Sequence, residues 1–182
     1  MISRSAIFIL FLFLVGNLVA CRPAELGVLY EGERLEVVDM HLHTGHWHKI
    51  GPDSQRFLAE RFPHPVGLNA ATTAEAQIQP KGILSEMDRA GVRRSVLFAV
   101  YAPRTVGITS NENVIENTAQ DPSRLFGFAS LRVDNWDLKR DQELEVLEAA
   151  LQHPQMIGVK LAHTHMRFRM DDPAYYPIYE LA

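Results

Sequence analysis

Strand-like and helix-like segments alternate along this chain, and that alternation constrains its fold more than any other feature. Short β-rich or continuously apolar segments cover residues 35–40, 95–100, 125–131 and 157–161. Helix-like periodicity follows them at residues 80–90, 114–119, 138–152 and 173–182. Four successive β-then-α units predict a parallel α/β sheet with helical crossovers, either a doubly wound sheet or a (β/α)8 TIM barrel. Because no phosphate-binding glycine motif follows the first strand, the barrel is favoured.

The number of units is half of what a closed barrel needs. A (β/α)8 barrel has eight units and is typically about 250 residues long, whereas the sequence has 182 residues. We therefore expect residues 35–182 to form the N-terminal half of a TIM barrel, incomplete at the C-terminus. Such a half-barrel leaves two parallel strand edges unpaired. We favour a fragment of a longer protein over a complete chain that is inactive alone. Whether the chain forms a homo-oligomer is left open.

Residues 1–20 have the composition of an export signal rather than of a folded element. An early cation precedes an apolar run at residues 7–15, which is too short for a transmembrane helix of about 20 residues. Residues 18–21, Leu-Val-Ala-Cys, resemble the lipobox of bacterial lipoproteins. That resemblance implies a lipid anchor on Cys21, residues 21–34 as a tether, and a location in the bacterial cell envelope. A plain secretory signal and an uncleaved anchor are the alternatives.

The composition excludes several other classes of protein. Apolar residues make up 47% of the chain, which is ordinary for a globular protein and too high for a disordered one. The single Cys excludes a disulfide framework and a zinc site built on several thiolates. Lys and Arg number 18 against 22 Asp and Glu, with no basic run, so nucleic acid is not an expected partner.

A His-x-His pair at the end of the first predicted strand is the main candidate for chemistry. Residues i and i+2 of a strand point to the same side, so His41 and His43 can both face the barrel axis. Two imidazoles at that spacing can bind one divalent cation, with zinc the first expectation. The alternative is that two polar residues merely end a strand edge.

Polar residues also follow the other predicted strands, where TIM barrels carry their active sites. Arg104 and Arg132 are candidates to bind an anionic substrate, with surface salt bridges as their alternative role. His163 and His165 are candidates for substrate contact, with exposed loop histidines as the alternative. The link at 44–79 is far longer than an ordinary βα loop and is expected to fold over the mouth and shape a substrate pocket.

The stretch at 37–45, Val-Val-Asp-Met-His-Leu-His-Thr-Gly, resembles the first-strand metal motif of the amidohydrolase superfamily. Residues 87–97, 111–129 and 157–180 are similar to later strands and helices of the amidohydrolase-related family, the branch that contains small-molecule hydrolases and nonoxidative decarboxylases. The first-strand motif is diagnostic, whereas the other segments share much with generic α/β units.

The resemblance implies a metal-dependent hydrolase that cleaves a small-molecule amide, ester or lactone through a metal-activated water. Further metal ligands and the general base are then expected beyond Ala182. Lys160 resembles the fourth-strand lysine that bridges two metals in some members when carboxylated, with a buried, hydrogen-bonded lysine as the alternative. A nonoxidative decarboxylase and a non-catalytic barrel lipoprotein are the competing functions.

Overall fold

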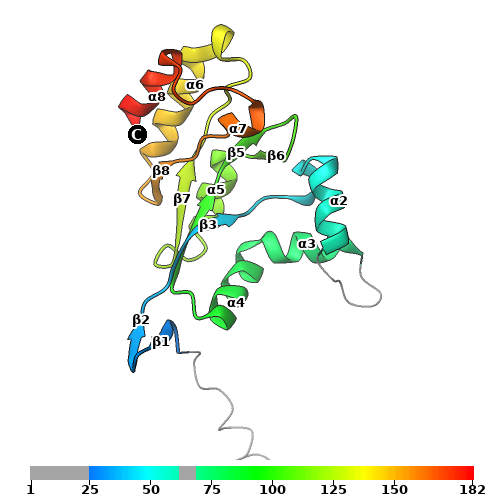
Figure 1. The fold of residues 1–182 in the computed structure, drawn as a ribbon, viewed down its shortest axis with the longest axis vertical. Coiled ribbons are helices and arrows are strands. Elements are labelled where there is room, and N and C mark those ends of the chain that lie inside the picture. The colour runs from blue at the N-terminus through cyan, green and yellow to red at the C-terminus, as the bar shows by residue number, and fades with distance from the viewer. Residues whose placement is uncertain (1–24, 62–68) are drawn as a thin grey trace, which may run out of the picture.

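A computed structural model of the chain describes residues 25–61 and 69–182, and helices and strands alternate along it (Figure 1). The strands are β1 (Val28–Tyr30), β2 (Glu33–Leu35), β3 (Val38–His43), β4 (Arg94–Phe98), β5 (Val100–Ala102), β6 (Gly107–Thr109), β7 (Leu125–Ala129) and β8 (Met156–Val159). The helices are η1 (Trp47–Lys49), α2 (Pro52–Arg61), α3 (Ala70–Ile78), α4 (Pro80–Ala90), α5 (Asn111–Thr118), α6 (Trp136–Leu151), α7 (His163–Met166), η2 (Pro173–Tyr175) and α8 (Tyr176–Leu181).

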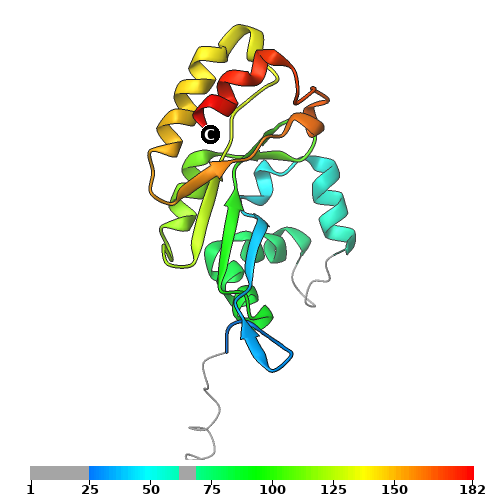
Figure 2. The ribbon, with the colours of Figure 1, turned by 60° about the vertical axis from the view of Figure 1, so that its left-hand side comes forward.

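The central sheet is parallel, with the strand order β3-β4-β7-β8. Each strand therefore pairs with the next one of the predicted βα units, as in the wall of a TIM barrel. The prediction of an α/β fold with half of such a barrel is confirmed. Figure 2 shows β3, β4 and β7 side by side.

The two faces of this sheet differ in what covers them. Ser95, Leu97 and Leu125 are fully buried on the helical face. A Cβ added to Gly127 would lie 2.6 Å from a methyl carbon of Val114, so α5 packs directly on that face of β7. In the register of the sheet, the other face carries Phe98 opposite Phe128. This inner face is the one that a closed barrel turns toward its axis.

Helix α4 begins and ends where the sequence predicts, at Pro80 and before Gly91. Proline is preorganised for the first helical turn, and Gly91 ends the helix in the left-handed region with φ +71°. A Cβ on Gly91 would also lie 2.9 Å from the carbonyl oxygen of Gly27.

We expect Gly91→Ala to lower the free energy of unfolding by about 1–2 kcal/mol, the cost of the left-handed conformation in an L-residue, plus a penalty for the contact with Gly27. Gly32→Ala is the matched control, because Gly32 has φ +86° but nothing within 4 Å of an added Cβ. Urea denaturation of both variants checks the difference. Equal losses would contradict the role of the Gly27 contact.

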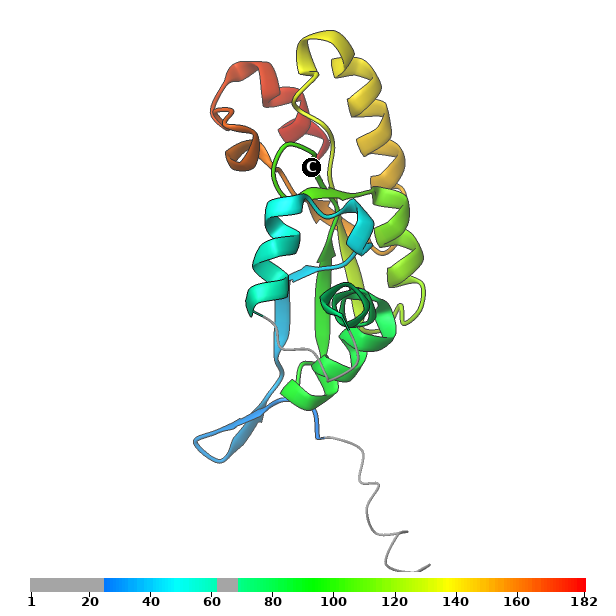
Figure 3. The same ribbon diagram turned by 90° about the vertical axis from the view of Figure 1, so that its right-hand side faces the viewer.

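Several sequence predictions need correction. The first strand is β3, three residues later than predicted, and it contains both histidines. Part of the predicted tether is folded, because β1 and β2 pair as an antiparallel hairpin and Gly27 N–H donates to Gly91 O at 2.6 Å. The residues at 44–79 are not one long loop but hold η1, α2 and α3. A second hairpin, β5 with β6, follows β4 (Figure 3).

The predicted signal at 1–20 and Cys21 lie outside the described residues. Among the helices that are described, none has the length and apolar character to cross a membrane.

Candidate functional site

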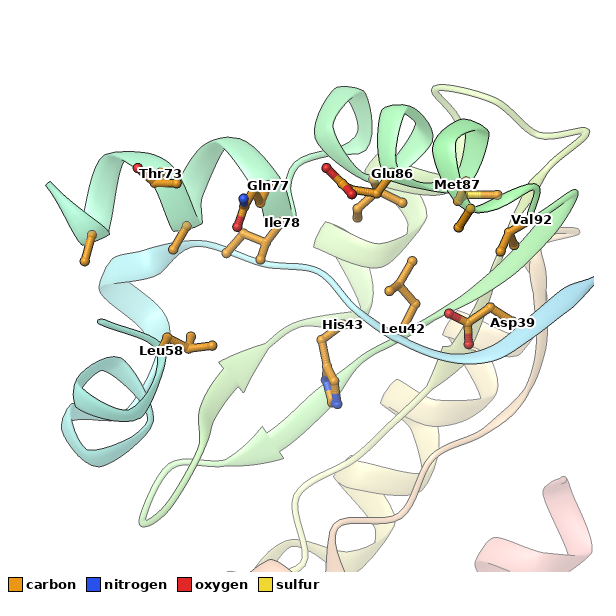
Figure 4. A pocket seen from close by; sticks show the side chains of 14 residues that line it. Asp39, Leu42, His43, Leu58, Thr73, Gln77, Ile78, Glu86, Met87 and Val92 are labelled. Atoms are coloured by element: carbon orange, nitrogen blue, oxygen red, sulfur yellow. The ribbon is translucent and has the colours of Figure 1, made fainter. Parts of the chain in front are cut away.

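Strand β3 presents two histidines on the inner face of the sheet. The register of β3 against β4 shifts between Asp39 and Leu42, and the side chain of Asp39 accepts a hydrogen bond from the backbone N–H of His41 at 2.9 Å. The rings of His41 and His43 then lie with centroids 5.2 Å apart. Figure 4 shows Leu42 pointing toward the helices and His43 pointing to the opposite side of the strand. The predicted side-by-side arrangement is therefore present.

Aromatic rings and one ammonium group surround the two histidines. The ring centroid of Phe98 lies 4.7 Å from that of His41 and 5.9 Å from that of His43. Phe128 stacks on Phe98 with ring centroids 5.4 Å apart. The ammonium nitrogen of Lys160 sits 5.1 Å from the centre of the Phe98 ring, in cation–π range. The structure thus brings Lys160 to the same face as the His-x-His pair.

The surroundings of His43 favour its neutral form. Desolvation by the surrounding atoms lowers its pKa, and so do the positive charges of His41, Lys160 and His165, in that order. Within residues 25–61 and 69–182, no hydrogen bond engages a ring nitrogen of His41 or His43. Neutral imidazoles with free lone pairs are the form that binds a divalent metal.

The described residues supply only part of a metal shell. No group of three or more His, Cys, Asp or Glu side chains within them is close enough to hold one ion. The donor set still fits a metal, because two nitrogens from one strand face are a common start to a zinc site. The general base expected beyond Ala182 stays a prediction.

A polar network that the sequence did not reveal fixes the chain immediately after His43. Thr44 is buried, and its hydroxyl donates to Ile78 O at 2.8 Å and accepts from the side-chain amide of Asn117 at 2.7 Å. The hydroxyl of Thr109 donates to Thr44 O at 2.8 Å. Elements α3, α5 and β6 therefore hold the end of β3, and with it the orientation of His43.

A second part of this network centres on His46. Its Nδ1 lies 2.9 Å from Glu75 Oε1, and its Nε2 lies 3.3 Å from the side-chain amide of Asn113. Glu75 also accepts the backbone N–H of Trp47 at 2.5 Å. Burial opposes ionisation of Glu75, but these hydrogen bonds outweigh it and lower the pKa of the carboxyl group. Both ring nitrogens of His46 are thus engaged in fixing the loop.

The two arginine candidates differ in their surroundings. Arg132 makes a two-point ion pair with Asp134, with N–O distances of 3.1 and 2.9 Å. The hydrogen bond from Arg132 lowers the pKa of Asp134. Arg104 is exposed in the turn between β5 and β6. Asp134 therefore already pairs with the guanidinium of Arg132. This ion pair is the salt bridge that was given as the alternative to substrate binding.

The histidines after β8 also differ. His165 is exposed, whereas His163 is fully buried and packs edge-on against Tyr175 with centroids 4.4 Å apart. Neither ring nitrogen of His163 has a hydrogen-bond partner among the described residues. Burial lowers the pKa of His163 from its ordinary value of 6.5.

We expect the folded state to lose stability as the pH falls below about 6.5, because His163 then takes up a proton in the unfolded chain but not in the folded one. The loss levels off once the pH passes below the lowered pKa of the folded state. Thermal unfolding between pH 7.5 and 5 checks this, with His163→Phe as the comparison. An identical pH slope in the variant would contradict the assignment.

An apolar cavity of about 290 Å³ lies on the helical side of β3 (Figure 4). Its apolar lining includes Leu42, Leu58, Ile78, Ile83 and Met87. The segment at 44–79, which was expected to cover the barrel mouth, thus contributes α2 and α3 to a cavity beside β3.

No protein-family model matches the sequence, and no curated protein matches it. Among solved structures, the chain is similar to an uncharacterized TIM-barrel protein from Bordetella bronchiseptica, with a TM-score of 0.58 and 18% identity over 80% of this chain and 51% of that chain. This likeness supports the barrel fold alone, and the chain spans about half the length of that neighbour.

Two further structures match less well. A 4-oxalomesaconate hydratase from Rhodopseudomonas palustris has a TM-score of 0.46 and 17% identity over 79% of this chain and 48% of its own. A 5-carboxyvanillate decarboxylase from Sphingomonas paucimobilis has a TM-score of 0.45 and 17% identity over 81% of this chain and 48% of its own. These scores are too low to carry an argument about function.

Proposed function

We propose that this chain forms part of a metal-dependent hydrolase of the amidohydrolase superfamily that cleaves a small-molecule amide, ester or lactone. The observation that carries the proposal is the pair of imidazoles, 5.2 Å apart between centroids, on the inner face of a TIM-barrel sheet at the end of its first strand. Active sites of this fold lie at that end of the strands.

His41 and His43 would hold the metal, expected to be zinc. A divalent cation bound there would lower the pKa of a coordinated water toward about 7 and polarise a carbonyl group. Phe98 forms an apolar wall beside both rings, and it excludes water from that side. Lys160 places a positive charge near His43, which favours a substrate or intermediate that carries negative charge.

The polar network around Thr44 supports this role by holding the end of β3. The hydroxyl of Thr44 donates to Ile78 O of α3 and its carbonyl oxygen accepts from Thr109 of β6, so His43 cannot turn away without breaking these hydrogen bonds. The lipobox-like residues 18–21 add the proposal that Cys21 carries a lipid and that the activity belongs to the bacterial cell envelope.

Assays of ester, lactone and amide hydrolysis test the proposed function on the whole hydrolase of which this chain is proposed to form part, measured as purified, after chelation and after zinc is restored. We expect hydrolysis of at least one class that disappears on chelation and returns with zinc. Release of CO2 from aromatic carboxylates in place of hydrolysis would indicate the decarboxylase. Hydrolysis that is indifferent to chelation would contradict a metal-dependent mechanism.

A further inference from the structure

His163 is a buried histidine that the proposed metal site does not use. It begins α7, close after the end of β8, and is 0% exposed. Among the described residues, neither of its ring nitrogens has a hydrogen-bond partner. A charged ring in this place would lose its hydration without gaining an acceptor, so the buried ring is stable only in its neutral form.

Residues 167–175, which we call the covering segment, lie over this ring. Tyr175 packs edge-on against His163 with ring centroids 4.4 Å apart, and Tyr175 is itself only 6% exposed. Trp136 of α6 contacts the same segment, because its ring lies 5.3 Å from that of Tyr175 and its Nε1–H donates to Ala174 O at 2.9 Å. Exposure of the His163 ring to solvent therefore requires that Tyr175 moves away.

The covering segment is held at its two ends and exposed between them. Arg167 ends α7 in the left-handed region with φ 60°, and the next N–H, of Phe168, donates to His163 O at 3.0 Å. At the other end, the side chain of Asp172 accepts the N–H of Ala174 at 2.9 Å. Residues 167–174 are all exposed. A segment with so few buried side chains opens at a lower cost in free energy than the core strands and helices.

The charged groups around His163 do not set its protonation. The titratable and charged side chains of α7, of the covering segment and of the adjoining ends of β8 and α6 are Asp137, Lys160, His165, Arg167, Arg169, Asp171, Asp172 and Tyr175. None of them contributes to the lowered pKa of His163, for which burial is the cause. Burial raises the pKa of Tyr175 above its ordinary value, so that side chain is neutral at acid and neutral pH. Under the covering segment, His163 is thus the group that responds to acid.

We propose that His163 is an acid-sensitive switch, in which protonation of its ring opens the covering segment. In the closed state the ring is neutral and packs beneath Tyr175. In the open state the ring carries a proton and is hydrated. Because this segment follows β8, at the end of the strands where TIM barrels carry their active sites, its opening alters the entrance to that end of the sheet. The switch does not depend on a metal at His41 and His43.

The direction and size of the effect follow from proton linkage. The open state binds the proton with the ordinary pKa of 6.5, whereas the closed state binds it only at lower pH. Since the open state binds more protons, its population rises as the pH falls. The equilibrium constant for opening is therefore expected to rise by up to about 30-fold from pH 7.5 to pH 5, and to level off below the lowered pKa of the closed state.

Limited proteolysis of the full chain by papain measures this opening, with cuts inside residues 167–175 located by mass spectrometry. Each cleavage rate is divided by that of the isolated peptide 163–175 at the same pH, which removes the pH dependence of the protease. We expect this ratio to rise by about 10–30-fold from pH 7.5 to pH 5 while circular dichroism shows a folded chain. His163→Phe keeps a ring beneath Tyr175 but takes up no proton, so its ratio should stay constant.

His165→Gln is the matched control, because His165 is an exposed histidine on the same helix. This variant should keep the full rise in cleavage. An equal rise in His163→Phe, a loss of the rise in His165→Gln, or first cuts outside the covering segment would each overturn the switch.

NMR of the unmodified chain gives a second measurement that needs no variant. The Cε1 proton of His163 should titrate over the same pH range in which cleavage rises. A ring that takes up its proton while the covering segment stays protected from papain would overturn the proposal.

Discussion

Replacing His41 and His43 together by alanine is expected to lower the affinity of the chain for zinc by more than about 100-fold. Loss of groups that only orient metal ligands typically costs about 10–100-fold, and this change removes the proposed ligands themselves. Isothermal titration with zinc measures the affinity of each protein. The fold should persist, because both side chains are exposed on the inner face.

His48→Ala is the control for this prediction. His48 is exposed and stacks on His46 with centroids 5.5 Å apart, but it belongs to η1 rather than β3. The single variant should bind zinc as the unmodified chain does. If His48→Ala weakened binding as much as the double variant, the site would lie in the loop and not on the strand.

The largest expected loss of stability follows substitution of Asn111, which is only 1% exposed. Its side-chain oxygen accepts Ser130 N–H at 2.8 Å, and its amide nitrogen donates to Ser130 O at 2.9 Å. Asn111→Ala leaves both buried backbone groups without partners. Each such group costs about 1–3 kcal/mol, so we expect a loss of about 3 kcal/mol in the free energy of unfolding, measured by urea denaturation.

Glu116→Ala on the same helix provides the comparison. Glu116 is exposed on α5, and a surface substitution of this kind changes stability by no more than about 0.5 kcal/mol. The difference between the losses of the two variants separates the cost of losing the hydrogen bonds with Ser130 from the change in helix propensity. A loss below about 1 kcal/mol in Asn111→Ala would show that water replaces the amide and that Asn111 does not tie α5 to the end of β7.

The parts of the fold that were predicted correctly are those with a local signal. Pro80 and Gly91 mark the two ends of α4. The apolar run that becomes β4 is buried as expected of a central strand. In the candidate site, the spacing of His41 and His43 was enough to predict that both side chains lie on one face of the strand, because strand geometry alone puts alternate residues on one face.

The parts that were missed depend on contacts between distant segments. Thr44 and Asn117 are 73 residues apart in sequence and meet only after α5 has packed on the sheet. The pairing of His46 with Glu75 needs α3, whose sequence of alanines and threonines lacks a clear apolar face. Burial of His163 depends on Tyr175, which is brought over it by the turn before α8. No pattern within one element contains such information.

In the proposed function, His41 and His43 bind a metal on the inner face of the barrel sheet. Anomalous scattering at the zinc absorption edge, from crystals of the zinc-loaded chain, locates the bound metal. We predict a single strong peak within about 2.0–2.1 Å of a ring nitrogen of each of the two histidines. A peak elsewhere, with both rings free of metal, would contradict a metal site on β3.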